Sequence, residues 1–308
     1  MERENESALN EALKPYCDDC RRQLTIPEDA YKQYDIKRGL RNADGTGVLA
    51  GVTRICNVHG YILEDSQRRP TEGRLFYRGI DIRDIIEGCT AEDRFGFEEV
   101  VWLLLFGYLP TAEQLSGFTR LLEQHRELPE GFIEDMIIKA PSPNIMNKLA
   151  RSVLALYSYD ELAEDMSLEN IVRQSIELIA RVSTIMVNAY QVKKRYYDHE
   201  SLFFHSPIDG MSFSENILST LRFDRQFTRE EAKLLDICLI LHAEHGGGNN
   251  STFACRVLSS SGTDTYAAIS AAIGGLKGPR HGGANIKVMQ MLEGMKTAIR
   301  DSGDDEEI

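Results

Sequence analysis

Apolar residues recur at helical spacing along most of the chain, and capping residues or glycines bound several of these runs. The pattern predicts helices over residues 97–106, 144–157, 168–193, 229–245 and 266–276, and a further helix that begins near 283–285. Residues 111–114 and 228–231 fit the capping box, in which a threonine and an acidic or amide side chain satisfy the first backbone N–H groups. The chain is therefore expected to be mainly helical.

Strand signals are confined to the front of the chain. β-branched and aromatic residues predict two short strands, 53–62 and 74–82, joined by a polar loop over 64–73. The alternating strand–helix units of a doubly wound sheet do not occur in the pattern. We therefore expect an all-α fold with one small N-terminal β-hairpin.

Two of the predicted helices have unusual composition. The helix over 229–245 is apolar almost all round, which predicts burial on most of its sides. The helix over 266–276 is rich in Ala, Gly and Ser, which allow a close approach of another helix. A central core helix and a subunit interface both fit that composition.

Composition narrows the class of protein. The net charge of −13 disfavours nucleic-acid binding, which needs a basic surface. No apolar run approaches the roughly 20 residues that span a bilayer, so no membrane association is expected. The N-terminal sequence is acidic and polar, which predicts a cytoplasmic protein.

The six cysteines do not predict a metal site or a disulfide framework. Cys17 and Cys20 form a C-x-x-C pair, but no second Cys or His pair follows at the spacing of a zinc finger. Cys238 and Cys255 lie in apolar helical patterns and are expected to be small core residues.

Two glycine-rich segments, 241–250 and 278–285, carry the candidate chemistry. Gly246 and the two glycines after it are expected to end the preceding helix. His245 would then lie at a helix C-terminus, where the dipole favours a positive charge suited to holding a carboxylate. Asn249 or Asn250 is expected to cap the helix that follows.

His281 has the opposite setting, because it lies just before a predicted helix N-terminus. The dipole there favours a neutral imidazole, which can donate one N–H to a developing enolate oxygen. We therefore interpret His245 and His281 as two working residues of one active site for an anionic carbonyl substrate. The alternative is that each is a loop histidine with a buried hydrogen bond, and for His242 a structural role is equally expected. Residues 242–245 do not match the H-E-x-x-H metal motif, so no metal is predicted.

At these residues the sequence resembles the citrate synthase family. The segments LHAEHGGGNNSTF and GGLKGPRHGGAN are similar to that family's two active-site segments, and GVLAGVTRI, GRLFYRGIDIRDI and FEEVVWLLLFGYLPTAEQL resemble its N-terminal region. The resemblance implies a helical fold with a large and a small domain, usually dimeric. It assigns 1–32 to an extension, 33–277 to the large domain and 278–308 to the start of the small domain.

The resemblance also implies a reaction. The family condenses acetyl-CoA with oxaloacetate and hydrolyses the thioester, with the CoA compound as a substrate and no cofactor. By position, His281 would stabilise the enol of the thioester and His245 would bind oxaloacetate, with Asn249 and Ser251 as supporting polar residues. The family's later segment, with a second histidine, an aspartate base and arginines, has no counterpart after His281. We therefore expect the front part of such an enzyme, with negligible activity alone.

Two alternatives stay open. One is a 2-methylcitrate synthase, which uses propionyl-CoA. The other is a non-catalytic binding or assembly protein on the same scaffold. The reading frame after Ile308 would separate an enzyme from an assembly protein.

Overall fold

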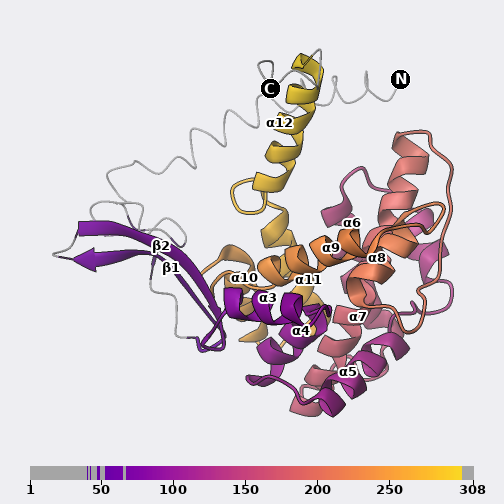
Figure 1. Ribbon diagram of the computed structural model, residues 1–308. Coiled ribbons are helices and arrows are strands. Elements are labelled where there is room, and N and C mark those ends of the chain that lie inside the picture. The colour runs from indigo at the N-terminus through magenta and orange to yellow at the C-terminus, as the bar shows by residue number, and fades with distance from the viewer. Residues whose placement is uncertain (1–39, 41, 43–46, 49–52, 65–66, 300–308) are drawn as a thin grey trace, which may run out of the picture. The chain divides into compact units, whose positions relative to one another are not determined.

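The computed structural model describes residues 40, 42, 47–48, 53–64 and 67–299 (Figure 1). The chain divides into two units, Met1–Leu49 and Ala50–Ile308, and every helix and strand named below belongs to the second. The strands are β1 (Cys56–Glu64), β2 (Gln67–Tyr77) and β3 (Ile80–Asp81). The α-helices are α3 (Ile82–Ala91), α4 (Phe97–Phe106), α5 (Ala112–Gln124), α6 (Ile145–Leu156), α7 (Leu168–Tyr197), α8 (Phe213–Leu221), α9 (Arg229–His242), α10 (Asn250–Ser259), α11 (Thr265–Lys277) and α12 (Ala284–Ala298). A π-helix, η1 (Ile133–Ile138), and a 3-10 turn, η2 (Tyr157–Tyr159), lie on either side of α6.

The predicted hairpin is confirmed, and a short third strand extends it into an antiparallel sheet of order β1-β2-β3. The predicted loop over 64–73 is wrong, because β2 begins at Gln67 and pairs with β1 from its first residue. Polar residues can form this ribbon because the backbone ladder supplies the hydrogen bonds while charged side chains face solvent. Arg69 and Glu64, for example, form an ion pair of 2.8 Å. The predicted strand end at Ile82 is also wrong, since Asp81 caps α3 there.

The predicted helices are confirmed, and their caps explain where they begin. Threonine capping boxes begin α5 and α9 at Thr111 and Thr228. Ser167 caps α7, which continues to Tyr197, beyond the predicted end at 193. Gly107 ends α4 in a left-handed conformation, with φ of 90°, so that its N–H bonds the carbonyl of Leu103 at 2.8 Å.

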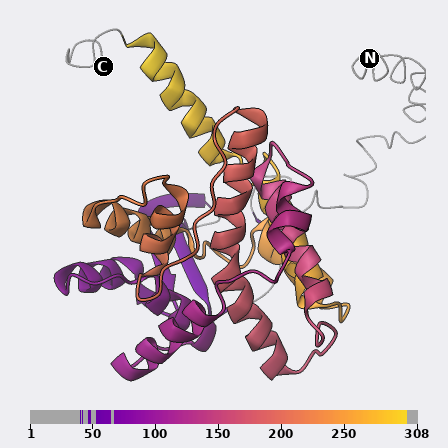
Figure 2. The same ribbon diagram turned by 90° about the vertical axis from the view of Figure 1, so that its right-hand side faces the viewer.

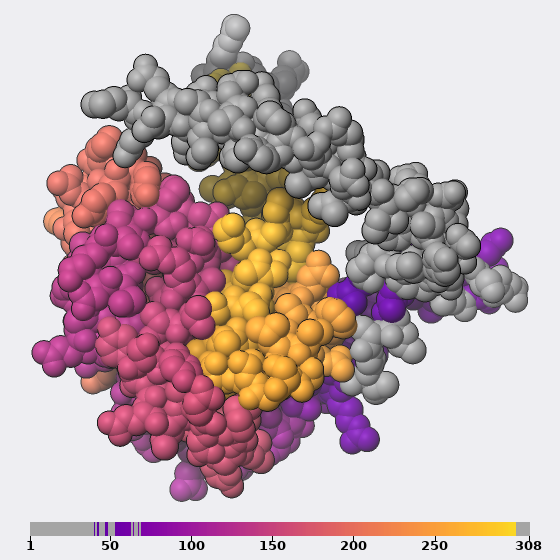
Figure 3. All heavy atoms as spheres, turned by 180° about the vertical axis from the view of Figure 1, so that it is seen from behind, coloured from indigo at the N-terminus to yellow at the C-terminus, as the bar shows by residue number. Residues whose placement is uncertain are grey.

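The largest cluster of buried apolar side chains lies where α6, α7, η1 and α11 meet. Figure 2 shows α7 as the long red helix with α6 beside it. The small residues of α11 let it pack closely against both α6 and α10, and Ser270 Oγ donates to the carbonyl of Ala150 at 2.9 Å. Figure 3 shows the orange to yellow surface of α10 and α11 next to the magenta surface of α6. The small-residue helix is therefore a packing element within the chain, and its role in a subunit interface stays a prediction.

The expected all-round burial of α9 is wrong. Its buried residues are Ala232, Asp236 and Ile240, which form a single stripe, whereas Leu234 is 65% exposed. Cys238 is exposed as well, so it is not a core residue, and Cys255 is half-buried. An apolar composition does not reveal which side of a helix finds a neighbour, and here only one side faces α4 and α8. Cys17 and Cys20 lie outside the described residues.

Candidate active site

The structure brings together the two glycine–histidine segments. His245 follows the end of α9, and His281 follows the end of α11. Their ring centroids lie 5.8 Å apart, and the ring planes are inclined by 42°. His245 is exposed, while His281 is half-buried. Two imidazoles from remote parts of the chain therefore face one small region that a ligand can reach.

His245 does not lie at the helix C-terminus as expected, because α9 ends at His242 with Ala243 as its C-cap. The next backbone N–H, that of Glu244, donates to the hydroxyl of Tyr77. Gly246 then turns the chain with φ of 111°, a conformation that a residue with a Cβ rarely adopts. His245 is thus carried by the turn after α9, beyond the last helical turn in which the helix dipole acts.

The His281 imidazole is held by a side chain of α10. Ser251 Oγ lies 2.7 Å from His281 Nε2, and Ser251 stands in the first turn of α10. The backbone of His281 bonds back to Gly278, with its N–H 2.9 Å from that carbonyl. His281 precedes α12, whose N-cap is Gly283, as the sequence predicted. The ring therefore has a fixed orientation with Nε2 engaged.

Asn249 is the N-cap of α10, as predicted. Its Oδ1 accepts from the N–H of Thr252 at 2.9 Å, and its Nδ2 donates to the carbonyl of Gly246 at 2.5 Å. The side chain thus ties the turn after His245 to the helix that carries Ser251. Its position fits a supporting role.

His242 is the last residue of α9, and its side chain is exposed. Its Nδ1 lies 2.7 Å from the carbonyl of Cys238, one turn earlier in the helix. This contact fits a histidine that closes its own helix, so the structural interpretation of His242 is favoured.

Two glycines next to His281 are needed for packing, and a third lies in close contact with α10. A Cβ on Gly282 would collide with the carbonyl of Leu276, and one on Gly283 would lie 2.5 Å from the carbonyl of Pro279. A Cβ on Gly275 would lie 3.4 Å from the Cα of Ser251, where α11 crosses α10. The glycines next to His281 thus serve the turn itself.

Nothing in the sequence indicated that residues of the β-sheet contact the turn that carries His245. Tyr77 is fully buried and contacts the end of α9, and Cys56 is its partner across β1 and β2. Burial raises the pKa of Cys56 to about 11 and that of Tyr77 to about 12, so both keep their protons near neutral pH. Glu244 Oε1 accepts from the N–H groups of His245 and Gly246, at 3.0 and 2.6 Å. The segment GRLFYRGIDI contained Tyr77, but no local pattern in it points to a contact with residues 240–246.

The family model for "Citrate synthase, C-terminal domain" matches residues 42–305. The chain belongs to the citrate synthase family. It is 32% identical over 264 residues to the citrate synthase of Haloferax volcanii, covering 84% of this chain and 62% of that protein. It is 37% identical to the citrate synthase of Deinococcus radiodurans over a match that covers 74% of this chain and 56% of that protein. It is 33% identical to 2-methylcitrate synthase 1 of Corynebacterium glutamicum, covering 83% and 61%.

Solved structures of citrate synthases share the fold. The Pyrobaculum aerophilum enzyme superposes with a TM-score of 0.68 at 28% identity, covering 85% of this chain and 62% of that one. The Thermoplasma acidophilum enzyme, solved with carboxymethyl coenzyme A and oxaloacetate, superposes with a TM-score of 0.65 at 26% identity. The match covers 82% of this chain and 59% of that one. These neighbours confirm the mainly helical fold. The chain spans 56% to 62% of the length of the curated relatives named above.

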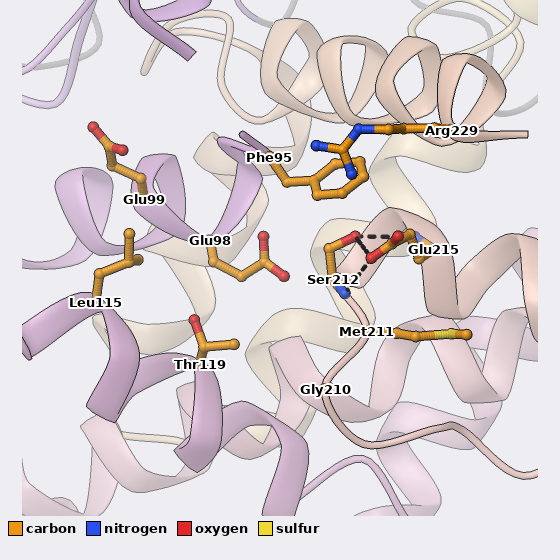
Figure 4. A pocket seen from close by; sticks show the side chains of 10 residues that line it. All are labelled: Phe95, Glu98, Glu99, Leu115, Thr119, Gly210, Met211, Ser212, Glu215 and Arg229. Atoms are coloured by element: carbon orange, nitrogen blue, oxygen red, sulfur yellow. Dashed lines mark hydrogen bonds between the residues drawn. The ribbon is translucent and has the colours of Figure 1, made fainter. Parts of the chain in front are cut away.

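A separate hollow of about 410 Å³ lies among α4, α5, α8 and α9 in this member of the citrate synthase family, and Figure 4 shows its side chains. Glu98 Oε1 accepts from the N–H of Phe213 at 2.6 Å, and Glu215 Oε2 accepts from that of Ser212 at 2.8 Å. Burial raises the pKa of Glu98. These carboxylates close the N-terminus of α8, and neither histidine segment lines the hollow, so we do not place the active site there.

Neither a metal cluster nor a membrane span is found in the described part of the chain. Its helices include none that is long and apolar enough to cross a bilayer. No group of three His, Cys, Asp or Glu side chains among the described residues lies close enough together to hold a metal ion.

Proposed function

We propose that the whole protein to which this chain belongs condenses an acyl-CoA with oxaloacetate and releases CoA, as a citrate synthase. The observation that carries the proposal is the Ser251-held His281 ring, 5.8 Å from that of His245. The reaction breaks a C–H bond next to the thioester carbonyl, forms a C–C bond to the ketone carbon, and hydrolyses the thioester. No cofactor is proposed, because the CoA compound is itself a substrate.

In this proposal His281 acts as a neutral donor. If Ser251 Oγ donates to Nε2, the ring proton stays on Nδ1, which can then donate to the thioester oxygen as it becomes an enol. His245, exposed beside it, would hold oxaloacetate through a charge-assisted hydrogen bond. Asn249 would keep the His245 turn fixed to α10. The base that removes the proton is not assigned to a residue of this chain.

A second candidate is 2-methylcitrate synthesis from propionyl-CoA. It is favoured by the 33% identity to the Corynebacterium enzyme, which is as high as the 32% identity to the Haloferax citrate synthase. The homodimer and the cytoplasmic location also stay proposals. Light scattering at micromolar concentration tests the dimer, and a mass near that of one subunit would contradict it.

The test of function is oxaloacetate-dependent release of free CoA thiol by the whole protein, with acetyl-CoA and propionyl-CoA compared. We expect His281→Ala to lower kcat by about 100-fold or more, because it removes the donor to the developing enol. His205→Ala is the matched control, since His205 is another histidine with one backbone contact, 3.0 Å to the carbonyl of Phe223. No thiol release would favour the non-catalytic assembly protein, and release that does not depend on oxaloacetate would indicate thioester hydrolysis and contradict the proposed condensation.

A further inference from the structure

The turn that carries His245 forms where β2 meets the end of α9. Tyr77 is the last residue of β2 and is fully buried. Its hydroxyl oxygen lies 2.8 Å from the carbonyl oxygen of Ile240 and 3.2 Å from the amide nitrogen of Glu244. If the α-helix continued, the N–H of Glu244 would donate directly to the carbonyl of Ile240, four residues earlier. The hydroxyl therefore occupies the place of the next helical hydrogen bond.

The base of the hairpin closes the same turn from a second side. Cys56, on the other strand, pairs with Tyr77 across the two strands. A Cβ placed on Gly246 would lie 3.8 Å from a methyl group of Val58. The turn is thus held between its own glutamate and two strands that lie far away in the sequence.

We propose that Tyr77 is a positioning residue for His245. Its hydroxyl stops α9 at His242 and so sets the distance between the His245 and His281 rings. The hydroxyl contacts the backbone of residues 240 and 244, so it does not touch a substrate. The inference rests on the proposed function, in which the two rings share one substrate pair.

The physical consequence of losing the hydroxyl is an extension of the helix. In Tyr77→Phe the carbonyl of Ile240 and the N–H of Glu244 can bond each other. Each added helical residue rotates the following chain by about 100°. His245 would then turn away from His281, while the aromatic ring would still fill the core beside Ile82 and Leu103.

The first test is a spectroscopic one on the 308-residue chain labelled with 13C at histidine Cε1, which gives seven resonances. We expect Tyr77→Phe to shift the His245 resonance and to abolish the nuclear Overhauser contact between His245 and His281. Tyr266→Phe is the matched control, since Tyr266 is equally buried and its hydroxyl donates to Asp160 at 2.8 Å, away from the histidines. It should leave both signals unchanged.

The second test is kinetic and uses the whole protein. Tyr77→Phe should raise KM for oxaloacetate about tenfold, the equivalent of one hydrogen bond, with a smaller change in kcat. Unchanged His245 signals in Tyr77→Phe, or equal shifts in Tyr266→Phe, would overturn the positioning role. If the wild-type protein does not use oxaloacetate, the proposed function fails, whereas the NMR comparison still decides the role of Tyr77.

Discussion

The two histidine segments are built by different means. The turn after α9 is held by Tyr77, which lies more than 150 residues earlier in the sequence. The turn before α12 is held mostly by itself, because the N–H groups of His281 and Gly282 both reach the carbonyl of Gly278, at 2.9 and 3.0 Å. The backbone that carries His245 therefore depends on a contact from the sheet, whereas the backbone that carries His281 is closed locally and only its ring is held from α10. Substitutions should separate the two: a steric change within the His281 turn should disturb His281, and a change in β2 should disturb His245.

The largest effect is expected from Gly282→Ala. The added methyl group meets the carbonyl of Leu276, so the turn must open. We expect a loss of about 2 kcal/mol in the free energy of unfolding, which is typical of overpacking. The proposed activity should fall about 100-fold, because a misplaced His281 loses its alignment. Denaturant unfolding and thiol release measure the two effects.

Gly294→Ala is the control for that substitution. Gly294 lies on exposed α12, and a Cβ there would meet nothing within 4 Å. The change should stabilise α12 by up to about 1 kcal/mol, since alanine is the better helix former. Similar behaviour of the two variants would contradict a local steric origin.

Acid should weaken the contact between Asp160 and the first turn of α11. Burial opposes ionisation of Asp160, but hydrogen bonds from Gln174, Arg173 and Tyr266 lower its pKa to about 2, from 3.8. Because the folded state favours the carboxylate, its stabilisation is complete above about pH 4 and is lost as pH falls through about 2. The difference corresponds to roughly 2 kcal/mol.

Urea unfolding between pH 2 and pH 5 measures this contribution. Asp160→Asn should be less stable than wild type at pH 5 and should show a flatter dependence on pH. Identical pH profiles for the variant and the wild type would assign the stabilisation to other groups.

The same contrast explains how much could be predicted from the sequence. The capping boxes at Thr111 and Thr228 and the setting of His281 before a helix N-terminus are local patterns, and each was predicted. The meeting of the two histidines was an interpretation of their opposite settings at helix ends and of the family resemblance.

The errors share one cause, which is tertiary contact. The end of α9 depends on a hydroxyl from β2, and no pattern within 229–245 contains it. Cys238 is exposed because no neighbouring element among the described residues packs against its side of α9. The charged ribbon over 67–73 is a strand because β1 pairs with it, although its composition suggests a loop.

A smaller effect is expected from Ser251→Ala, which tests the link between α10 and His281. The variant loses the contact of 2.7 Å to Nε2, so the ring can change tautomer or rotate. We expect kcat to fall about tenfold, with KM for oxaloacetate little changed. Ser259→Ala, at the other end of α10, removes only a contact with the carbonyl of Arg256 and should leave kcat unchanged. A rise in KM for oxaloacetate without a fall in kcat would assign Ser251 to the His245 side instead.

The smallest effect is expected at Asn249, which contacts the turn after His245 and caps the helix that carries Ser251. Asn249→Ala removes the cap of α10 and should cost about 1 kcal/mol in the free energy of unfolding. Asn249→Ser keeps a capping oxygen but loses the amide that donates to the carbonyl of Gly246 at 2.5 Å. We therefore expect Asn249→Ser to recover most of the stability while the His245 resonance stays shifted, because capping is local to α10 whereas the amide ties the two turns together. Full recovery of the His245 resonance in Asn249→Ser would mean that the hairpin alone fixes that turn.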